Sequence, residues 1–374
     1  MAKYKIALMP GDGIGIEVME AAVLVLEKLQ LDAEYVHADI GWNFWCREGN
    51  ALPQATIKTL KSCNCSLFGA ITSKPNDKAV QELIPELQGK NLTYRSPIIT
   101  LRQMFDLYVN LRPCKTYPGN PLNYKDNIDL VIFRENTEGL YSGIEFNPLP
   151  NSVRASLAEH SSAMDRFKGI ASDEIAVSLR VITKKGAQRI IRKAFEYASK
   201  FDYPTVTIVE KPNVLRETSG LMLREARALA LKYPGIELRE TNIDAQAMWL
   251  IKNPEDYGVI VTSNMFGDIL SDLSAQLVGG LGFASSGNIG DNFAIFEPCH
   301  GSAPKYAGQY KVNPIAMIMA TKLMLDWLGE KEKANMLEQS IAKIIAEGKM
   351  RTYDMGGNSS TLDMAHAISL YLDE

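Results

Sequence analysis

Two aspartates in the segment SNMFGDILSDL, residues 263–273, stand four positions apart. On an α-helix this spacing puts Asp268 and Asp272 on one face, with their Cβ atoms about 5–6 Å apart. Two like charges at that separation repel each other and destabilise the helix. The pattern therefore indicates either a helix face that points into water or a cation that lies between the two carboxylates.

A third acid, Asp244, occurs in the segment TNIDAQAM, outside the helix predicted around 263–273. Carboxylate oxygens suit Mg²⁺ or Mn²⁺, and oxygen atoms of a substrate can complete the octahedron around such an ion. The three aspartates are therefore candidate metal ligands. A solvated helix face would explain the pair on the helix without any ligand, so both interpretations stay open here.

Three arginines lie beside apolar residues instead of in polar runs: Arg102 in LRQMF, Arg112 in VNLRP and Arg134 in VIFREN. A guanidinium in apolar surroundings is costly unless it meets an anion, and arginine is the natural bidentate partner of carboxylates. Each arginine alone could equally form a structural ion pair. Taken with the aspartates, they predict a site for a polycarboxylate that is bound through a divalent ion.

A run of three glycines, Gly11, Gly13 and Gly15, follows a predicted strand and precedes a predicted helix. A dinucleotide-binding fingerprint requires the spacing GxGxxG, whereas this run has the spacing GxGxG. We therefore predict a tight turn between strand and helix, not a standard Rossmann nucleotide site.

The composition excludes several classes of protein. The chain has 374 residues, of which 46% are hydrophobic and 22% charged, as in globular proteins, and its length suggests two domains. A net charge of −4 without a basic tract argues against nucleic-acid binding, and no apolar run approaches a membrane span. The N-terminal residues lack the features of a signal peptide, and five cysteines fit reduced thiols, so we expect a cytoplasmic protein.

The elements that must position these residues follow an alternating pattern. YKIALMP, GIEVMEAAVLVLEKLQ and AEYVHADIG are typical of strand, helix and strand. Further strands are predicted at CSLFGAIT, IDLVIFREN, TVTIVEKPN, YGVIVTSN and FAIFEPCHG, and helices at TKKGAQRIIRKAFEYASKF and SGLMLREARALALKYP. Such alternation favours an α/β fold. Residues 145–182 lack a long helical period and predict an arm or a hairpin.

Longer motifs carry a resemblance to a known family. The segments LRQMFDLYVNLRP, IDLVIFRENTEGLYSGIE, EKPNV, IVTSNMFGDILSDLSAQLVGGLGFASSGNIGD and FEPCHGSAPKYAGQYKVNP resemble the isocitrate/isopropylmalate dehydrogenase family, nearly from end to end. Its members are metal-dependent, β-decarboxylating dehydrogenases of 2-hydroxy acids, and their α/β fold is not the standard Rossmann fold. The resemblance implies a large discontinuous cofactor-binding domain (1–106 and 276–374), a smaller central substrate and dimerisation domain (107–275), and an interlocking arm near 141–180.

The resemblance also implies roles for single residues. Asp268 and Asp272, with Asp244 of the partner subunit in a homodimer or larger homo-oligomer, would hold Mg²⁺ or Mn²⁺, which activates the substrate hydroxyl as a Lewis acid. Lys211 matches the lysine that helps to remove the hydroxyl proton, and Tyr141 matches the tyrosine that protonates the enol after CO₂ leaves. The expected substrate-binding residues are Ser96, Arg102, Arg112, Arg134 and Asn213.

The identity of the substrate is less sharply marked. Ser96 matches the serine that isocitrate dehydrogenases place against the γ-carboxylate, but Ile98 stands where those enzymes usually have asparagine. An apolar residue favours 3-isopropylmalate, whereas the segment before Arg102 lacks the acidic, leucine-rich pattern of the isopropylmalate enzymes. We expect isocitrate first and homoisocitrate second, with 3-isopropylmalate as a further alternative.

The cofactor is expected to be NADP, with NAD as the alternative. NAD-using members usually carry Asp and Ile after the proline of the HGSAP motif, where this chain has Lys305 and Tyr306, which suit a 2′-phosphate. Tyr353 matches another residue on the NADP side, but Gly357 stands where a helping arginine is expected. The expected cofactor-binding residues are Glu297, His300, Gly301, Ser302, Ala303, Lys305, Tyr306, Asn313, Tyr353 and Asp354.

Two other classes of function would require different sequence features. Some relatives are regulatory subunits that have lost metal ligands or catalytic residues, whereas this chain keeps Lys211, Tyr141 and all three aspartates. A P-loop NTPase would need the motif GxxxxGK[ST], which the sequence lacks. We therefore predict an active enzyme. Oligomer size beyond a dimer and regulation by phosphorylation of Ser96 stay open.

Overall fold

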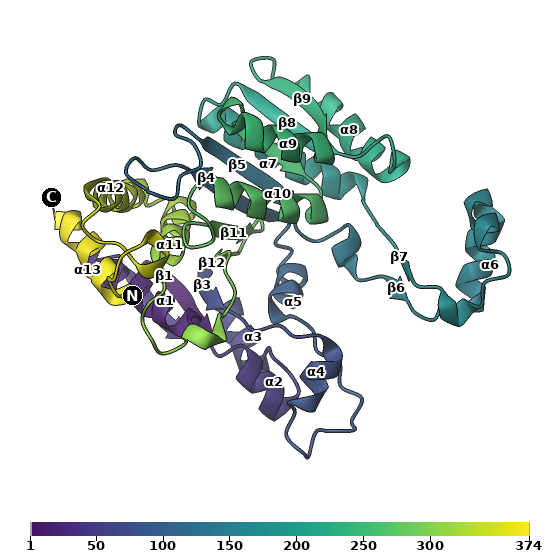
Figure 1. The fold of residues 1–374 in the computed structure, drawn as a ribbon, viewed down its shortest axis with the longest axis horizontal. Coiled ribbons are helices and arrows are strands. Elements are labelled where there is room, and N and C mark those ends of the chain that lie inside the picture. The colour runs from purple at the N-terminus through teal and green to yellow at the C-terminus, as the bar shows by residue number, and fades with distance from the viewer. Residues whose placement is uncertain (1, 374) are drawn as a thin grey trace.

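The computed structural model describes residues 2–373 and contains one ten-stranded sheet that runs through the body of the molecule (Figure 1). Its strands are β1 (Tyr4–Gly11), β2 (Ala33–His37), β3 (Cys65–Ala70), β4 (Val109–Lys115), β5 (Asp129–Glu135), β8 (Thr205–Glu210), β9 (Glu237–Asn242), β10 (Val259–Thr262), β11 (Ser285–Ile289) and β12 (Ala294–Pro298). They lie in the order β2-β1-β3-β12-β11-β4-β5-β10-β8-β9.

The sheet contains two groups of parallel strands that run in opposite directions. β2, β1, β3 and β12 form one group, and β5, β10, β8 and β9 form the other. Between the groups, β11 is antiparallel to β12 and to β4, and β4 is antiparallel to β5. The first group comes from both ends of the chain and the second from its middle. The domain boundaries themselves stay a prediction.

Helices cover the sheet and confirm the predicted α/β alternation. They are α1 (Gly15–Lys28), α2 (Trp42–Glu48), α3 (Gln54–Lys61), α4 (Asn76–Gln81), α5 (Pro97–Met104), α6 (Asn151–His160), α7 (Lys184–Lys200), α8 (Arg216–Ala230), α9 (Ile243–Lys252), α10 (Asn264–Leu277), α11 (Ile315–Leu328), α12 (Lys331–Glu347) and α13 (Thr361–Leu370). Among residues 2–373, none of these helices combines the length and apolar character needed to cross a lipid bilayer.

Three strands of the second group, β5, β8 and β10, have continuous apolar runs because both of their faces are covered, whereas the edge strand β9 is polar. Along β5, Val131 and Phe133 pack in a core with α7 and α8, whereas Leu130 and Ile132 pack in another core with α9 and α10. Parallel strands buried on both faces have this pattern. The first group is covered on one side by α1, α11, α12 and α13, which share the core of β1 and β3.

The glycine run forms the predicted tight turn between β1 and α1. A Cβ atom at Gly11 would lie 1.9 Å from the carbonyl oxygen of Ala70, and one at Gly15 would lie 2.3 Å from that of Pro10. A Cβ at Gly13 would lie 2.1 Å from the carbonyl oxygen of Ser302. The glycines are therefore required by close backbone approach at the edge of the sheet, where the HGSAP loop also lies.

The predicted arm projects from the body (Figure 1). Its two legs, β6 (Glu145–Phe146) and β7 (Val177–Ser178), pair in antiparallel fashion, and α6 lies beyond them. The helix was not predicted, because α6 buries none of its residues in this chain and so its sequence shows no apolar stripe. Whether this arm interlocks with another copy stays a prediction.

Candidate active site

Asp268 and Asp272 lie on α10, and a cation does contact both of them. Arg112, from the neighbouring strand β4, places Nη1 3.0 Å from Asp272 Oδ1 and Nη2 3.5 Å from Asp268 Oδ1. Its Nη1 also donates to Ser271 on the same helix at 2.7 Å. The repulsion between the two carboxylates is therefore offset within the chain by a guanidinium.

Arg134 on β5 is the second arginine on this helix. It is 1% exposed, it forms an ion pair with Asp268, and its Nε and Nη2 donate to Asn264 Oδ1 at 3.0 and 2.8 Å. Gly267 makes this approach possible, because a Cβ there would lie 2.7 Å from the Arg134 side chain. Burial, together with the charges of Arg102 and Arg112, lowers the pKa of Arg134 to about 10, so it stays charged at neutral pH.

Tyr141 completes the contacts of Asp268. It lies in the short 3₁₀ helix Leu140–Ser142, and its hydroxyl donates to Asp268 Oδ2 at 2.6 Å. Burial and the bond to Asp268 raise the pKa of Tyr141, so the phenol keeps its proton. Burial also raises the pKa of Asp268, but the charge of Arg134 and the bond from Tyr141 outweigh it and lower the pKa overall. The site therefore holds a protonated phenol against an ionised carboxylate.

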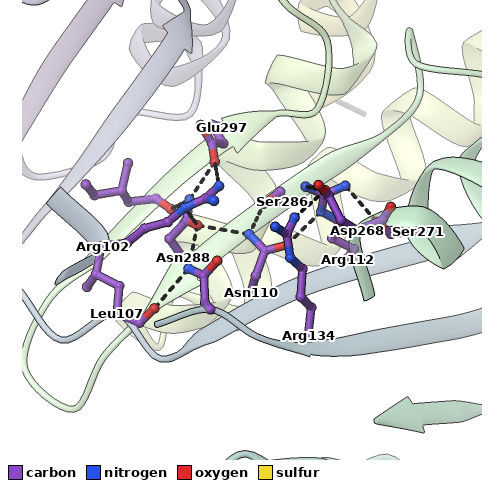
Figure 2. A network of polar contacts seen from close by, with 12 residues as sticks. Arg102, Leu107, Asn110, Arg112, Arg134, Asp268, Ser271, Ser286, Asn288 and Glu297 are labelled. Atoms are coloured by element: carbon purple, nitrogen blue, oxygen red, sulfur yellow. Dashed lines mark hydrogen bonds and ion pairs between the residues drawn. The ribbon is translucent and has the colours of Figure 1, made fainter. Parts of the chain in front are cut away.

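A buried network of asparagines connects the arginines (Figure 2). Asn288 on β11 is fully buried, and its Oδ1 accepts from Arg102 Nε at 2.8 Å and from Asn110 Nδ2 at 2.9 Å. Its Nδ2 donates to Glu297 Oε1 at 2.7 Å, and Asn110 Oδ1 accepts from Arg112 Nε at 2.7 Å. Asparagine side chains thus link both arginines to each other and to the expected cofactor side.

Sequence reasoning missed Asn110 and Asn288. The signal was present, since both are polar residues within otherwise apolar contexts, in YVNLRP and SSGNIGD. Buried polar groups of this kind are retained when each finds a partner. The same reasoning that selected the arginines would have selected these asparagines.

A small cavity of about 180 Å³ opens beside this network. Ile98 and Arg102 line it from one face of α5, and Arg112, Glu297 and His300 line it from β4 and from the end of β12. Burial lowers the pKa of His300, and its Nε2 is buried without a hydrogen-bond partner among the described residues. The cavity is therefore a candidate for the reacting part of a ligand.

The remaining substrate and catalytic candidates lie elsewhere. Ser96 lies at the start of α5 with no hydrogen bond from its side chain to the helix, and Asn213 is exposed in the loop after β8. Lys211 in that loop donates to Asp244 Oδ1 on α9 at 2.5 Å, and this bond lowers the pKa of Asp244. Within residues 2–373, no three His, Cys, Asp or Glu side chains gather closely enough to hold a metal ion. One chain thus unites Arg102, Arg112, Arg134, Tyr141, Asp268 and Asp272, but not Asp244 with the other two aspartates.

The HGSAP loop packs against the glycine turn. The carbonyl of Ser302 accepts from the Ile14 amide at 2.9 Å, and its hydroxyl lies 2.7 Å from that of Thr72. Ala303 has a left-handed backbone with φ 36°, and Gly301 has open space where a Cβ would lie. This geometry presents the loop backbone at the surface beside the start of α1.

Lys305 and Tyr306, the two residues that favour NADP, lie close to Tyr353. The Tyr306 and Tyr353 hydroxyls are 3.3 Å apart, and Lys305 Nζ lies 4.7 Å from the centre of the Tyr306 ring. The adjacent Asp354 accepts from Asn313 Nδ2 at 3.1 Å. Gly357, where the resemblance would expect an arginine, has no room for a side chain, because a Cβ would lie 2.1 Å from the Arg351 carbonyl oxygen.

Comparison with known proteins identifies the family. Residues 5–368 match the family model described as isocitrate/isopropylmalate dehydrogenase. The chain belongs to this family. Isocitrate/isopropylmalate dehydrogenases are metal-dependent, β-decarboxylating oxidoreductases that use NAD or NADP and act on small hydroxy acids. A crystal structure of isocitrate dehydrogenase from Methylococcus capsulatus matches with a TM-score of 0.85 and 37% identity, covering 99% of this chain and all of that one.

Individual members of the isocitrate/isopropylmalate dehydrogenase family carry different substrate names. 3-Isopropylmalate dehydrogenase of Methanothermobacter thermautotrophicus is 42% identical over the full length of both chains. Homoisocitrate dehydrogenase of Methanocaldococcus jannaschii is 41% identical, over 98% of this chain and 97% of that one. Protein DlpA of Legionella pneumophila is 43% identical over 97% of this chain, which spans only 58% of DlpA.

The residues on α10 fit the divalent metal that isocitrate/isopropylmalate dehydrogenases use. Asp268 has a lowered pKa, and the side chain of Asp272 is 61% exposed, so both offer carboxylate oxygens of the kind that Mg²⁺ and Mn²⁺ prefer. In the structure, Arg112 and Arg134 form ion pairs with these carboxylates. Asp268 and Asp272 would therefore hold such an ion, once these arginines turn to the carboxylates of a substrate.

Proposed function

We propose that this protein catalyses the oxidative decarboxylation of isocitrate to 2-oxoglutarate, with NADP as the hydride acceptor. The observation that carries the proposal is one network in which Arg112 and Arg134 pair with Asp268 and Asp272 on α10, while Arg102 is joined to Arg112 through Asn288 and Asn110. In the chain these guanidiniums are paired with Glu297, Asp268 and Asp272, and a substrate with three carboxylates and a hydroxyl would supply alternative anionic partners together with ligands for a divalent ion.

The side chains of the site divide the chemistry among them. Mg²⁺ or Mn²⁺, when bound, acts as a Lewis acid on the substrate hydroxyl. Lys211 would help to remove the proton of the substrate hydroxyl, and a bound nicotinamide would accept the hydride from the carbon that carries this hydroxyl. The bond to the β-carboxylate then breaks and CO₂ leaves. Tyr141, whose raised pKa keeps it protonated, would then donate a proton to the carbon that carried this carboxylate.

We propose further that the site is shared between the two subunits of a homodimer. Lys211 and Asp244 pair with each other, away from Asp268. Asp244 lies on α9 and Asp268 on α10, and both helices carry exposed apolar side chains that support contact with a second copy. Met248 and Ile251 on α9 are 54% and 49% exposed, and Ile269 on α10 is 54% exposed. The paired helices would bring Asp244 of the partner subunit to the Asp268 side.

Homoisocitrate is the second candidate substrate, ahead of 3-isopropylmalate. Ile98 lines the same cavity as Arg102, so that one wall of the candidate pocket is apolar. A longer or more apolar substituent than the γ-carboxylate of isocitrate would contact this wall favourably. The relatives that are named for homoisocitrate and 3-isopropylmalate support keeping both alternatives.

One activity measurement tests these proposals. The purified protein with Mg²⁺ or Mn²⁺ is given isocitrate, homoisocitrate or 3-isopropylmalate, each with NADP or NAD, and the absorbance of the reduced nicotinamide is followed. We expect the highest kcat/KM with isocitrate and NADP. A higher kcat/KM with homoisocitrate or 3-isopropylmalate would make that acid the substrate in place of isocitrate. Absence of turnover with every pair would instead favour the non-catalytic regulatory class.

A further inference from the structure

The strands that carry the arginines border a second cavity on their opposite face. Side chains alternate between the two faces of a strand. On β4, Asn110 and Arg112 belong to the candidate active site, whereas Val109 and Leu111 line a cavity of about 590 Å³. On β5, Phe133 lines this cavity, one residue before Arg134. We call it the reverse-face cavity, and its floor is therefore the back of the substrate site.

The walls of the reverse-face cavity come from different parts of the chain. One wall is the C-terminal half of α7 and the residues after it, with Tyr197 and Phe201. The other is α11 and α12, with Leu323 and Trp327. Among the described residues that line the cavity, none on α7 makes a hydrogen bond or ion pair to one on α11 or α12. A ligand between them would therefore connect two walls that the chain itself leaves unconnected.

The lining determines which class of ligand fits. Seven aromatic and eight charged side chains line the cavity, and some of the rings cluster: Tyr197 lies with its ring centre 5.3 Å from that of Phe133 and 4.4 Å from that of Phe201. The charged groups are mostly paired with one another, as Lys322 is with Glu338 at 2.9 Å. Among the described lining residues, two charged groups have no ion pair: Asp129 accepts a hydrogen bond from the Tyr203 hydroxyl at 2.9 Å, and Lys200 is exposed, with its ammonium 5.0 Å from the centre of the Phe201 ring. Pockets of this size and composition bind aromatic small molecules.

From these observations we propose that the reverse-face cavity is a regulatory binding site for a planar aromatic molecule that carries one anionic group. The rings of Tyr197, Phe201 and Trp327 contact its aromatic part, and Lys200 contacts its anion. Occupancy changes the affinity of the substrate site, because β4 and β5 form the floor of both. By linkage, the substrate must change the affinity of the cavity by the same factor.

The direct test uses anilinonaphthalene sulfonate, a fluorescent aromatic anion, and the native full-length protein. We expect saturable fluorescence enhancement that persists when excess NADP and NAD fill the cofactor site. We also expect the probe to change the KM of the preferred substrate at least twofold. Displacement by either cofactor would place the probe in the cofactor site and overturn the proposal. Binding that leaves KM unchanged would overturn its regulatory part.

Variants at the mouth of the cavity locate the probe. Lys200→Glu reverses the exposed charge and should weaken binding about three- to tenfold, as expected for an exposed ion pair turned to repulsion. Lys232→Glu reverses an exposed charge in the turn after α8, which does not line the cavity, and should leave binding unchanged. Asn335→Trp fills the mouth from an exposed position of α12 and should abolish binding, whereas Asn335→Ala should not. Equal effects of the test and control variants would refute this location.

Discussion

At the scale of single residues, the candidate site depends on the groups that orient the arginine side chains as much as on the arginines themselves. Asn288 Oδ1 serves three donors, from Arg102, Asn110 and Asn136, at 2.8 to 3.0 Å. A single buried acceptor with three donors fixes the direction of each one. The position of Arg102 in the cavity is therefore set by a residue that need not touch the substrate.

Replacement of Asn288 by alanine tests this positioning role. The change removes an acceptor that three buried donors share. Asn110 and Asn136 keep Ser286 Oγ and the Leu107 carbonyl, but the Nε of Arg102 loses its partner, so we expect the KM for the substrate to rise about tenfold or more, with a smaller change in kcat. Asn288→Asp keeps the acceptor and should recover part of the loss. Ser286→Ala on the same strand removes only one acceptor of Asn110 and should change KM less than about twofold. Steady-state kinetics of the three variants measure these KM values, and melting temperatures detect any unfolding. Equal KM values in all three variants would exclude a positioning role for Asn288.

The cofactor preference also belongs to single residues. If NADP is the cofactor as proposed, Lys305 would add a charge-assisted contact to its 2′-phosphate, worth roughly 1.5–3 kcal/mol or about ten- to a hundredfold in binding. Lys305→Asp combined with Tyr306→Ile removes that contact and introduces a repelling carboxylate. We expect kcat/KM for NADP to fall by at least this factor, while that for NAD holds or rises. A preference that does not move, measured at one salt concentration, would show that these residues do not face the ribose.

At the scale of elements, one carboxylate connects α12 to α11 and to β4. Glu338 on α12 lies 2.9 Å from Lys322 on α11 and 2.7 Å from Lys115 on β4. Burial raises its pKa, but the charge of Lys322 and the bonds from both lysines outweigh it and lower the pKa to about 2. A carboxyl whose pKa is lower in the folded than in the unfolded chain stabilises the fold only where it is ionised.

This linkage predicts a pH-dependent effect of Glu338→Gln. Above pH 4.5, the ordinary pKa of the group, the variant should be less stable than the wild type by roughly 1–3 kcal/mol. As the pH falls from 4.5 toward 2, the wild-type carboxylate becomes protonated and the difference should disappear. Denaturant unfolding across this range measures it. Glu237→Gln, at an exposed ion pair with Arg239, should show no such dependence, and a constant difference for Glu338→Gln would contradict the assignment.

The elements also differ in how well their sequences predicted them. β3, β5, β8 and β10 were predicted from apolar runs, because both of their faces are buried. β4 and β11 were not, since asparagine, arginine and serine interrupt their patterns. Those interruptions are the residues of the active-site network. The edge strand β9 was not predicted either, and its polar residues lie outside this network, so only in β4 and β11 does the failure coincide with the candidate site.

At the scale of the whole molecule, the proposed chemistry is divided between two places in one chain. Tyr141 and Asp268 lie on one side, and Lys211 and Asp244 on the other. If two subunits complete each site, chains with lesions on different sides should complement each other. A single lesion, in contrast, should inactivate both sites of a homodimer.

Mixed oligomers of two inactive variants test the shared site. Lys211→Ala and Asp272→Asn should each be nearly inactive alone, because one removes the group that takes up the proton and the other removes a metal ligand. A heterodimer of the two contains one site that is free of both lesions, so mixing should restore a measurable part of the activity. Subunit exchange is confirmed separately, by two distinguishable tags. Exchange without any recovery of activity would show that each site is built from a single chain.

The sequence by itself determined the α/β alternation, the turn at Gly11–Gly15 and the pairing of Asp268 with Asp272 on one helix face. These features depend on neighbours along the chain, where spacing and periodicity are decisive. Only the tertiary structure decided which distant residues meet. Arg102 reaches Asn288 across 186 positions, and Arg112 reaches Asp272 across 160. Such contacts follow from the order and direction of strands in the sheet, which no local pattern specifies, and the same order placed a second cavity behind the arginines.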